Sequence, residues 1–437
     1  MSDVSLGVFD SDARVGTVGY ETRDERFSFR YADSWRNRKT SYSISPHILM
    51  SAQEPASNTI RRFLENLLPE GRALDVVSST LKVSKNNLYG LIRELGQETS
   101  GALSFRGDEE YEIRPTTRRE IQKDELKQRI DERSQVPFAV WDGRVRMSMA
   151  GYQDKLSVYL DPDGRMYLVE GELASTHILK PEPTDDRLPM LVSNEHFSMS
   201  LAQRLGLAVA RVSIMRVPNP VLVVERFDRV REGPDQVRRL HIIDACQALD
   251  LPVAYKCERN FGSGKDVRNI RDGVSFARLF SIANYTVEKA LTRLELMRWA
   301  IFQFLIGNSD AHGKNASFYS RAAGLALAPA YDLVSVVQYQ GLDHELAMAF
   351  GDEFKLAEVR PYDWAQFAEQ TQIPRALLAR EMRRLGAAAV DAATIQAKEP
   401  AYQDNERDFV SKVAAFVHGQ AAKLTDMAGA VASIQLD

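Results

Sequence analysis

Apolar and polar residues alternate along three short segments at the start of the chain, residues 4–10, 14–20 and 26–31. Because successive side chains of a strand point to opposite faces of a sheet, this alternation predicts a β-meander. The pattern changes to helical spacing in residues 58–68, and residues 73–96 contain two further short helical stretches joined by the polar sequence VSKNN. Together these periods predict a small α+β unit.

Charged residues dominate the next segment, 117–133, which predicts a charged helix or linker. Strand-like apolar runs follow it and end near Arg229: 156–160, 166–170, 177–180, 210–217 and 221–227. The polar residues 230–239 predict a turn, and the chain beyond them has mainly helical periodicity, in 275–285, 291–307 and 362–370. A β-rich half followed by an α-rich half predicts two lobes with a cleft between them.

Composition adds few constraints. The chain has 437 residues, 44% hydrophobic and 27% charged, which is enough for more than one core. A net charge of -4 gives no overall attraction to nucleic acid or anionic lipid, although a local basic patch remains open. Cys246 and Cys257 have no Cys or His neighbours at metal-ligand spacing, and no long apolar run is free of charge. We therefore expect a soluble cytoplasmic protein without a membrane segment.

The densest polar chemistry follows an apolar helix. Residues 294–307 are apolar on nearly every face, so this helix is expected to be buried, and Gly307 marks its end. The sequence NSDAHGKN comes next, with Asp310 and Asn315 at the D-x4-N spacing of kinase catalytic loops. Asp332 follows Asp310 by 22 residues, after a hairpin-like segment at 316–329, where a kinase places its main metal-binding carboxylate.

A phosphoryl-transfer site also needs positive charge and backbone donors, and the β-rich half contains candidates for both. Lys180 closes the strand-like STHILK, Glu195 begins an amphipathic helix behind a predicted N-cap Ser193, and Gly151 lies in a small polar turn. Glu195 is a possible partner of Lys180. Each residue alone also fits an ordinary structural role, as a surface charge, turn former or helix-end residue, but their order along the chain matches the plan of a kinase.

These residues resemble the HipA-like serine/threonine kinases, the toxin halves of bacterial HipBA toxin–antitoxin systems. The segments SMAGYQDKL, STHILKP, VVERFDR, FLIGNSDAHGKN and YDLVS resemble blocks of the family's kinase core, and ENLLPEG and LGQETSGALSF resemble its N-terminal domain. The resemblance implies an α+β, bilobal protein-kinase-like fold with nucleotide between the lobes. It would divide the chain into an N-terminal α+β domain (1–115), a β-rich N-lobe (116–231) and a helical C-lobe (232–437).

The resemblance also implies roles for single residues. Asp310 would be the catalytic base, with His312 and Lys180 beside it in the catalytic set, and Asn315 and Asp332 would hold Mg²⁺. ATP would be bound by Gly151, Gln153, Lys155, Lys180, Glu225, Phe227, His312 and Tyr331, with the backbone of Glu225 and Phe227 at the adenine edge. Ser148 would be the autophosphorylated residue that switches the enzyme off, because a phosphate in this loop repels those of ATP.

By the same resemblance the protein is an ATP- and Mg²⁺-dependent toxin kinase. Its substrate would be a translation component such as an aminoacyl-tRNA synthetase, glutamyl-tRNA synthetase above all, and its action would cause growth arrest and persistence. The partner would be a HipB-like antitoxin that makes most contacts to operator DNA. Two alternatives stay open: a lipid or small-molecule kinase, since the loop lacks H-R-D and Tyr152 departs from the family pattern, or a weakly active corepressor. Direct DNA binding by residues 72–96 is disfavoured, because they have no basic face.

Overall fold

The structure is a computed structural model that describes residues 4–51, 53–107, 116–146, 153–171, 173–233 and 236–436. The chain forms two compact units, and it crosses between them several times. The first comprises Met1–Pro181, Met215–Val253 and Phe318–Ala326, and the second Glu182–Ile214, Ala254–Ser317 and Leu327–Asp437. The three-part division of the chain at residues 115 and 231 stays a prediction.

The first unit begins with the predicted meander, extended by one later strand. Its sheet has the order β3-β2-β1-β4, with β1 Val4–Asp10, β2 Ala13–Glu21, β3 Arg26–Tyr31 and β4 Leu103–Gly107. Alternate residues of β3 are buried, namely Phe27, Phe29 and Tyr31. The alternating pattern therefore predicted both the strands and the face that they bury.

The described residues of the same unit also form short helices: α1 Asp33–Arg36, α2 Ser57–Glu65, α3 Gly71–Leu81, α4 Leu88–Leu95, α5 Lys123–Asp131 and α7 Ala245–Ala248. Helices α2, α3 and α4 confirm the predicted helical stretches. The charged segment is helical only in α5, because Thr117–Ile121 forms strand β5 at the edge of a sheet, with Ile121 buried opposite Met166. The prediction was wrong for these five residues, because pairing with β9 determines their conformation more strongly than their local sequence does.

A six-stranded sheet of order β11-β12-β10-β8-β9-β5 carries the strands predicted in the β-rich half. They are β8 Leu156–Leu160, β9 Met166–Glu170, β10 His177–Pro181, β11 Val212–Val217 and β12 Asn219–Glu225. Strand β10 lies between β8 and β12, and Lys180 faces Leu222 across the β10–β12 pair. Leu156, Val158 and Leu179 are buried in the core of the sheet.

Three smaller strand groups lie wholly or mainly in the described part of the first unit. They are β6 Val140–Trp141 with β7 Arg144–Val145, β13 Arg229–Gly233 with β14 Gln236–Arg239, and β15 Ile242–Asp244 with β16 Ser317–Arg321 and β17 Gly324–Leu327. The simple turn predicted at 230–239 was wrong, because Arg229 pairs with Arg239 in a hairpin. The hairpin predicted at 316–329 is confirmed by β16 and β17.

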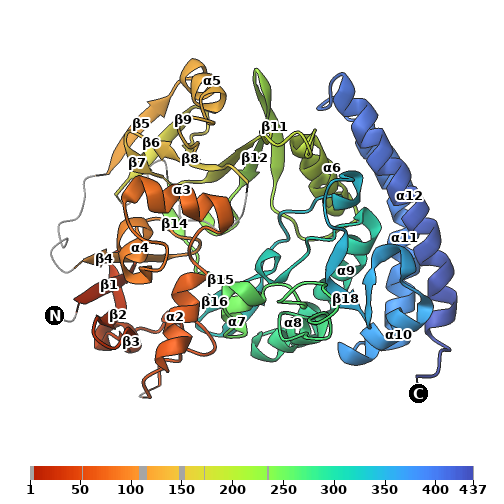
Figure 1. Ribbon diagram of the computed structural model, residues 1–437, viewed down its shortest axis with the longest axis horizontal. Coiled ribbons are helices and arrows are strands. Elements are labelled where there is room, and N and C mark those ends of the chain that lie inside the picture. The colour runs from red at the N-terminus through yellow and green to blue at the C-terminus, as the bar shows by residue number, and fades with distance from the viewer. Residues whose placement is uncertain are drawn as a thin grey trace. The chain divides into compact units, whose positions relative to one another are not determined.

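The second unit is mostly helical, as predicted. Its helices are α6 Leu191–Arg204, α8 Phe276–Ser281, α9 Lys289–Ile306, α10 Pro361–Gln370, α11 Arg375–Ala397 and α12 Asn405–Val431, and β18 Glu345–Phe350 pairs with β19 Glu353–Lys355. The chain also has short 3-10 turns at η1 Val253–Tyr255, η2 Ile282–Tyr285, η3 Gly313–Asn315, η4 Val336–Gln338 and η5 Leu356–Glu358. Figure 1 shows α12 lying along α11. No helix in the described part of the chain is long and apolar enough to span a bilayer.

Aromatic packing fixes the C-terminal end of the buried helix α9. The Phe304 ring lies 5.5 Å from the Trp364 ring and 5.9 Å from the Phe350 ring, and Phe350 lies 4.4 Å from Trp364, between ring centroids. Such edge-to-face and tilted contacts add to the free energy gained by burying the rings. The end of α9, where the polar loop starts, is therefore held on a rigid support.

The start of helix α6 differs from the prediction. Ser193 lies inside the helix rather than at its N-cap. The Glu182 carboxylate instead accepts hydrogen bonds from the N–H groups of Leu191 and Val192, at 3.0 and 3.1 Å. A negative charge at a helix N-terminus satisfies unpaired donors and complements the helix dipole, so Glu182 takes the capping role.

Candidate active site

The predicted catalytic loop leaves α9 through a left-handed residue, Gly307, whose φ is 64°. A Cβ added there would lie 2.6 Å from Val337 Cγ2 and 2.8 Å from the Phe416 ring. Glycine is therefore favoured both by the left-handed backbone conformation and by the lack of room for a side chain. Asn308 then donates its backbone N–H to the Gln303 carbonyl at 3.0 Å and its side-chain amide to Gln303 Oε1 at 2.9 Å. The first residues of the loop are thus tied back onto the helix.

Asp310 is the exposed residue of a loop that is otherwise buried. Its side chain is 69% exposed, whereas Ser309, Ala311 and His312 are buried. The Asp310 N–H donates to Asn308 Oδ1 at 3.0 Å, which fixes the local turn, and His312 Nε2 lies 3.9 Å from Asp310 Oδ1. The loop therefore presents one carboxylate to solvent with a defined geometry, as a base acting on a protein hydroxyl requires.

Asn315 is oriented by the same loop. Its Nδ2 donates to the Asp310 carbonyl at 2.8 Å, and its N–H donates to the His312 carbonyl at 2.9 Å. Because the amide nitrogen makes this bond, Oδ1 is the atom that can bind a cation. Gly313 anchors the turn through its N–H, which donates to the Lys256 carbonyl at 2.8 Å.

Tyr331 connects the two segments that carry the predicted metal ligands. Its hydroxyl donates to the Lys314 carbonyl at 2.6 Å and lies 2.8 Å from the Ser317 hydroxyl. Lys314 precedes Asn315 and Tyr331 precedes Asp332, so this bond brings the two ligands onto neighbouring segments. Asp332 has a φ of 56°, a left-handed conformation that is rare outside glycine and concentrated at functional sites.

One amide oxygen and one carboxylate suit Mg²⁺, which prefers oxygen ligands and completes its shell with waters and substrate phosphates. The orientation of the Asn315 amide fits such a site. No group of three or more His, Cys, Asp or Glu side chains among the described residues is arranged to hold a metal ion. Asn315 and Asp332 stay the predicted ligands of such a cation.

Predicted phosphate contacts lie in the first unit. Lys180 is buried in β10, with 7% of its surface exposed. The Gln153 side-chain amide donates to the carbonyl of Pro181, the residue after Lys180, at 3.4 Å, and Lys155 is half-buried nearby in sequence. Glu195 is buried in α6 of the second unit, so its pairing with Lys180 stays a prediction. The predicted positions Ser148, Gly151 and Tyr152 lie outside the described residues.

The predicted adenine-binding segment follows β12. Glu225 is exposed at the end of the strand, opposite His177, and burial lowers the pKa of His177. Phe227 is half-buried, and its carbonyl accepts a hydrogen bond from the Tyr319 hydroxyl at 2.9 Å. Sequence reasoning missed Tyr319, because only tertiary structure places β16 beside this segment.

Comparison with known protein families shows which family the chain belongs to. The HipA N-terminal domain matches residues 6–106, and the HipA-like C-terminal domain matches residues 147–393. The chain belongs to the HipA family. It is 39% identical to the serine/threonine-protein kinase toxin HipA of Shewanella oneidensis over 93% of each chain, and 32% identical to the putative kinase Y4mE of Sinorhizobium fredii over 86% of this chain and 87% of the relative.

A solved HipA structure has the same fold. In the complex of Shewanella oneidensis MR-1 HipA with HipB and its operator DNA, HipA matches 99% of this chain over 100% of its own length, with a TM-score of 0.89 and 36% identity. The predicted mixed α+β, kinase-like fold is confirmed. This HipA-family chain is a serine/threonine protein kinase, and protein kinases take their phosphoryl group from ATP.

Proposed function

We propose that this HipA-family kinase is the toxin of a bacterial toxin–antitoxin module. Its substrate is a translation component such as an aminoacyl-tRNA synthetase, glutamyl-tRNA synthetase above all, and phosphorylation causes growth arrest and persistence. Its partner is a HipB-like antitoxin, which makes most contacts to operator DNA. The support is the HipA toxin relative at 39% identity and the HipA–HipB–operator complex, which contains a chain of the same fold.

The observation that supports the proposed mechanism is the exposed Asp310 carboxylate on a buried, hydrogen-bonded loop. Asp310 accepts the proton of a substrate Ser or Thr hydroxyl while the hydroxyl oxygen bonds to the γ-phosphorus of ATP. The bond from that phosphorus to the β–γ bridging oxygen breaks, and ADP leaves. A positioned general base contributes about 10²–10⁴-fold to such a rate.

Other residues bind and orient the nucleotide. Mg²⁺, when bound, neutralises charge on the phosphate oxygens, and Asn315 and Asp332 are its proposed ligands. Lys180 contacts phosphates, and backbone groups of Glu225 and Phe227 meet the adenine edge. The remaining proposed ATP contacts are Gly151, Gln153, Lys155, His312 and Tyr331.

Regulation is proposed at Ser148, by phosphorylation of the chain by itself. A phosphate adds about 1.5–2 negative charges at neutral pH, which would oppose the phosphates of ATP bound near Gly151, three residues further along the chain. In a Ser148→Ala protein, the slow loss of activity during incubation with ATP should disappear. Inactivation at the wild-type rate would contradict this role.

The kinase proposal is tested with purified protein, γ-labelled ATP, Mg²⁺ and purified glutamyl-tRNA synthetase. Asp310→Asn should abolish labelling, whereas Asp391→Asn, which makes the same change at an exposed position on α11, should label at the wild-type rate. Peptide mapping assigns each labelled Ser or Thr. Labelling of an added lipid or other small acceptor, with no label on protein, would overturn the substrate class. Unchanged labelling by Asp310→Asn would overturn the role of the base.

A gel shift with operator DNA tests the proposed partner. The kinase alone should leave the DNA unshifted, and a HipB-like antitoxin alone should shift it. The kinase should produce a further shift only when the antitoxin is present. A shift by the kinase alone would instead assign DNA binding to this chain.

A further inference from the structure

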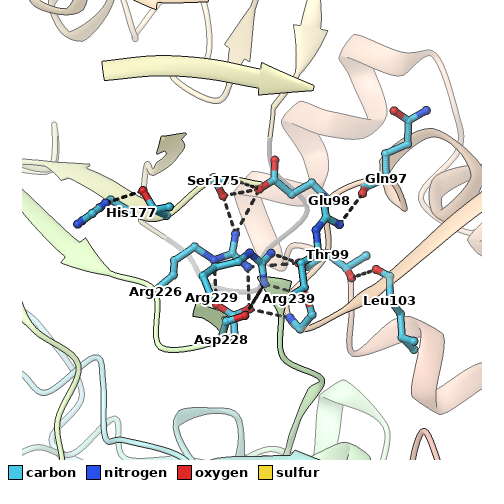
Figure 2. A network of polar contacts seen from close by, with 12 residues as sticks. Gln97, Glu98, Thr99, Leu103, Ser175, His177, Arg226, Asp228, Arg229 and Arg239 are labelled. Atoms are coloured by element: carbon cyan, nitrogen blue, oxygen red, sulfur yellow. Dashed lines mark hydrogen bonds and ion pairs between the residues drawn. The ribbon is translucent and has the colours of Figure 1, made fainter. Parts of the chain in front are cut away.

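Five charged side chains form a buried cluster in the first unit, directly beside the proposed adenine-binding segment. We name it the arginine cluster: Glu98, Arg226, Asp228, Arg229 and Arg239 (Figure 2). The side chains of Arg226 and Arg229 are each 1% exposed. Burying charges to this degree is costly unless they are paired and hydrogen-bonded. Each arginine of the cluster therefore depends on its ion-pair and hydrogen-bond partners.

Asp228 lies at the centre of the cluster. Arg226 binds it with two parallel hydrogen bonds, Nε to Oδ1 at 3.0 Å and Nη2 to Oδ2 at 2.8 Å, and Arg229 Nη1 donates to Oδ2 at 2.8 Å. The positive charges of Arg226 and Arg229 hold the pKa of the Asp228 carboxyl well below its ordinary value despite burial. Removing this carboxylate would leave two buried guanidinium groups without their shared counter-ion.

The other side of the cluster comes from residues 97–101, which lie in the part of the chain matched by the HipA N-terminal domain. Arg226 and Arg229 both donate to the Thr99 carbonyl at 3.3 Å, Arg229 also donates to the Gly101 carbonyl at 2.9 Å, and the Gly101 N–H donates to Asp228 at 2.8 Å. The Glu98 carboxylate lies 3.5 Å from Arg226.

Ser175 and Arg239 attach the same stretch to the kinase part of the chain. The Ser175 hydroxyl donates to Glu98 and accepts from Arg226 at 3.0 Å. Arg239 donates to the Gln97 carbonyl at 3.1 Å. Residues 97–101 are therefore bonded at one point to strands β13 and β14 and to Ser175, Arg226 and Asp228.

The backbone between these side chains is fixed residue by residue. The Arg226 N–H donates to the Thr176 carbonyl at 2.9 Å, the Phe227 carbonyl accepts from Tyr319 at 2.9 Å, and the Asp228 carbonyl accepts from the Leu240 N–H at 2.8 Å. Burial raises the pKa of Tyr319 to about 12, so its hydroxyl remains a donor at neutral pH. Arg226 and Asp228 are buried, whereas Phe227 between them is half-buried. The cluster anchors both neighbours of Phe227.

We propose that the arginine cluster positions the Phe227 backbone for adenine, so that residues 97–101 of the N-terminal region set the affinity and base selectivity of the nucleotide site. This inference rests on the proposed adenine contact at Phe227. Glu98, Arg226, Asp228 and Arg229 are positioning residues, because they act on the nucleotide only through the backbone that they hold. Loss of one charge lets this backbone relax and misplaces the groups that distinguish adenine from other bases.

Calorimetric titration of the full-length protein with a non-hydrolysable ATP analogue and with the matching inosine analogue tests the proposal. The inosine base lacks the amino donor of adenine, so the ratio of the two dissociation constants reports on contacts at the base edge. In Asp228→Asn we expect about tenfold weaker binding of the adenine analogue, because a displaced Phe227 backbone loses a hydrogen bond to the base that is worth about a factor of ten. The ratio of the two dissociation constants should fall towards one.

Asp250→Asn is the matched control. Asp250 in the same unit also accepts two hydrogen bonds from one arginine, Arg62, and links it to Thr59, but it contacts no residue of the arginine cluster among the contacts found for the described residues. The control should lose thermal stability and keep both dissociation constants within about twofold. Wild-type affinity and base ratio in Asp228→Asn would overturn the proposal.

A second variant keeps the test decisive if Asp228→Asn does not fold. Glu98→Gln removes one charge at the edge of the cluster and retains an acceptor for Ser175, and it should also lower the base ratio. An unchanged ratio in folded Glu98→Gln would then overturn the proposal. Failure of the wild-type protein to bind the adenine analogue would instead contradict the proposed ATP site itself.

Discussion

The Tyr331 hydroxyl donates a 2.6 Å hydrogen bond to the carbonyl of Lys314, and this one bond joins the segments that carry Asp332 and Asn315. The same hydroxyl lies 2.8 Å from Ser317 Oγ. The two proposed Mg²⁺ ligands are thus each one residue from a shared anchor, so their spacing depends on a residue that need not touch the metal.

Tyr331→Phe removes this anchor with little change in shape. Because a buried acceptor loses its partner, we expect the phosphoryl-transfer rate at fixed Mg²⁺ to fall by about tenfold, corresponding to about 1–2 kcal/mol. Raising the Mg²⁺ concentration should restore part of the rate. The measurement is a Mg²⁺ titration of γ-phosphate transfer, with Tyr285→Phe, a change at an exposed tyrosine, as the control. An identical Mg²⁺ dependence in wild type and Tyr331→Phe would contradict this role.

Gly313→Ala tests the packing of the catalytic loop. The added Cβ would lie 2.6 Å from Val274 Cγ2 and 3.0 Å from Val274 Cβ, so one of the two segments must move. We expect a loss of about 1–3 kcal/mol in the free energy of unfolding, the usual cost of overpacking, and a lower transfer rate. Denaturant unfolding measures the first quantity and labelled ATP the second.

A compensating substitution makes that prediction specific. Val274→Ala removes the methyl groups that would clash, so the double variant should be more stable than the sum of the two single changes predicts. Neighbouring residues that share one space couple in this way. Strict additivity of the two changes would show that the clash with Val274 is not the cause.

Two buried histidines predict lower stability in acid. Burial lowers the pKa of both His196 and His241 to about 4, from an ordinary value near 6.5. The unfolded chain therefore binds protons below pH 6.5 that the folded chain does not, so their contribution to stability is complete above that pH and declines as pH falls from about 6.5 to 4. Each histidine should therefore lower the free energy of unfolding at pH 5 by about 2 kcal/mol relative to its value at pH 7.5.

Urea unfolding at pH 7.5 and pH 5 measures this difference. His241 stacks on Tyr42 at 5.1 Å and bonds to the Ile44 carbonyl at 2.9 Å, so His241→Asn is expected to lower stability at both pH values. The informative quantity is the difference in the free energy of unfolding between pH 7.5 and pH 5, which should be smaller in His241→Asn than in wild type by about 2 kcal/mol. A gap of wild-type size in His241→Asn would mean that this histidine is not buried in its neutral form.

Glu182→Ala tests the unexpected cap of helix α6. The variant leaves the N–H groups of Leu191 and Val192 without their carboxylate acceptor, and we expect a loss of about 1 kcal/mol in the free energy of unfolding. Glu358→Ala, which removes an exposed carboxylate paired with Lys355, should cost less than about 0.5 kcal/mol. Equal losses in the two variants would assign no capping role to Glu182.

Local periodicity identified most strands and helices of this chain. The meander at 4–31, strand β10 and the buried helix α9 appear where alternation or an all-apolar helical face predicted them, because each element buries a pattern that is visible within its own residues. Strand β5 was missed because its partner, β9, lies elsewhere in the sequence, and the β13–β14 hairpin was missed because its strands are rich in charged residues and show no apolar alternation.

The proposed active site also depends partly on local sequence and partly on tertiary contacts. The sequence by itself determined the residue types and order of the proposed active site, Lys180 before Asp310, Asn315 and Asp332, because motif spacing is a local property of the chain. Only the tertiary structure decided that Asp310 is exposed while its neighbours are buried, that Tyr331 joins the segment of Asn315 to the segment of Asp332, and that residues 97–101 accept hydrogen bonds from Arg226 and Arg229. These features depend on contacts between segments far apart in sequence, whose positions are set by packing and by the need to pair buried polar groups.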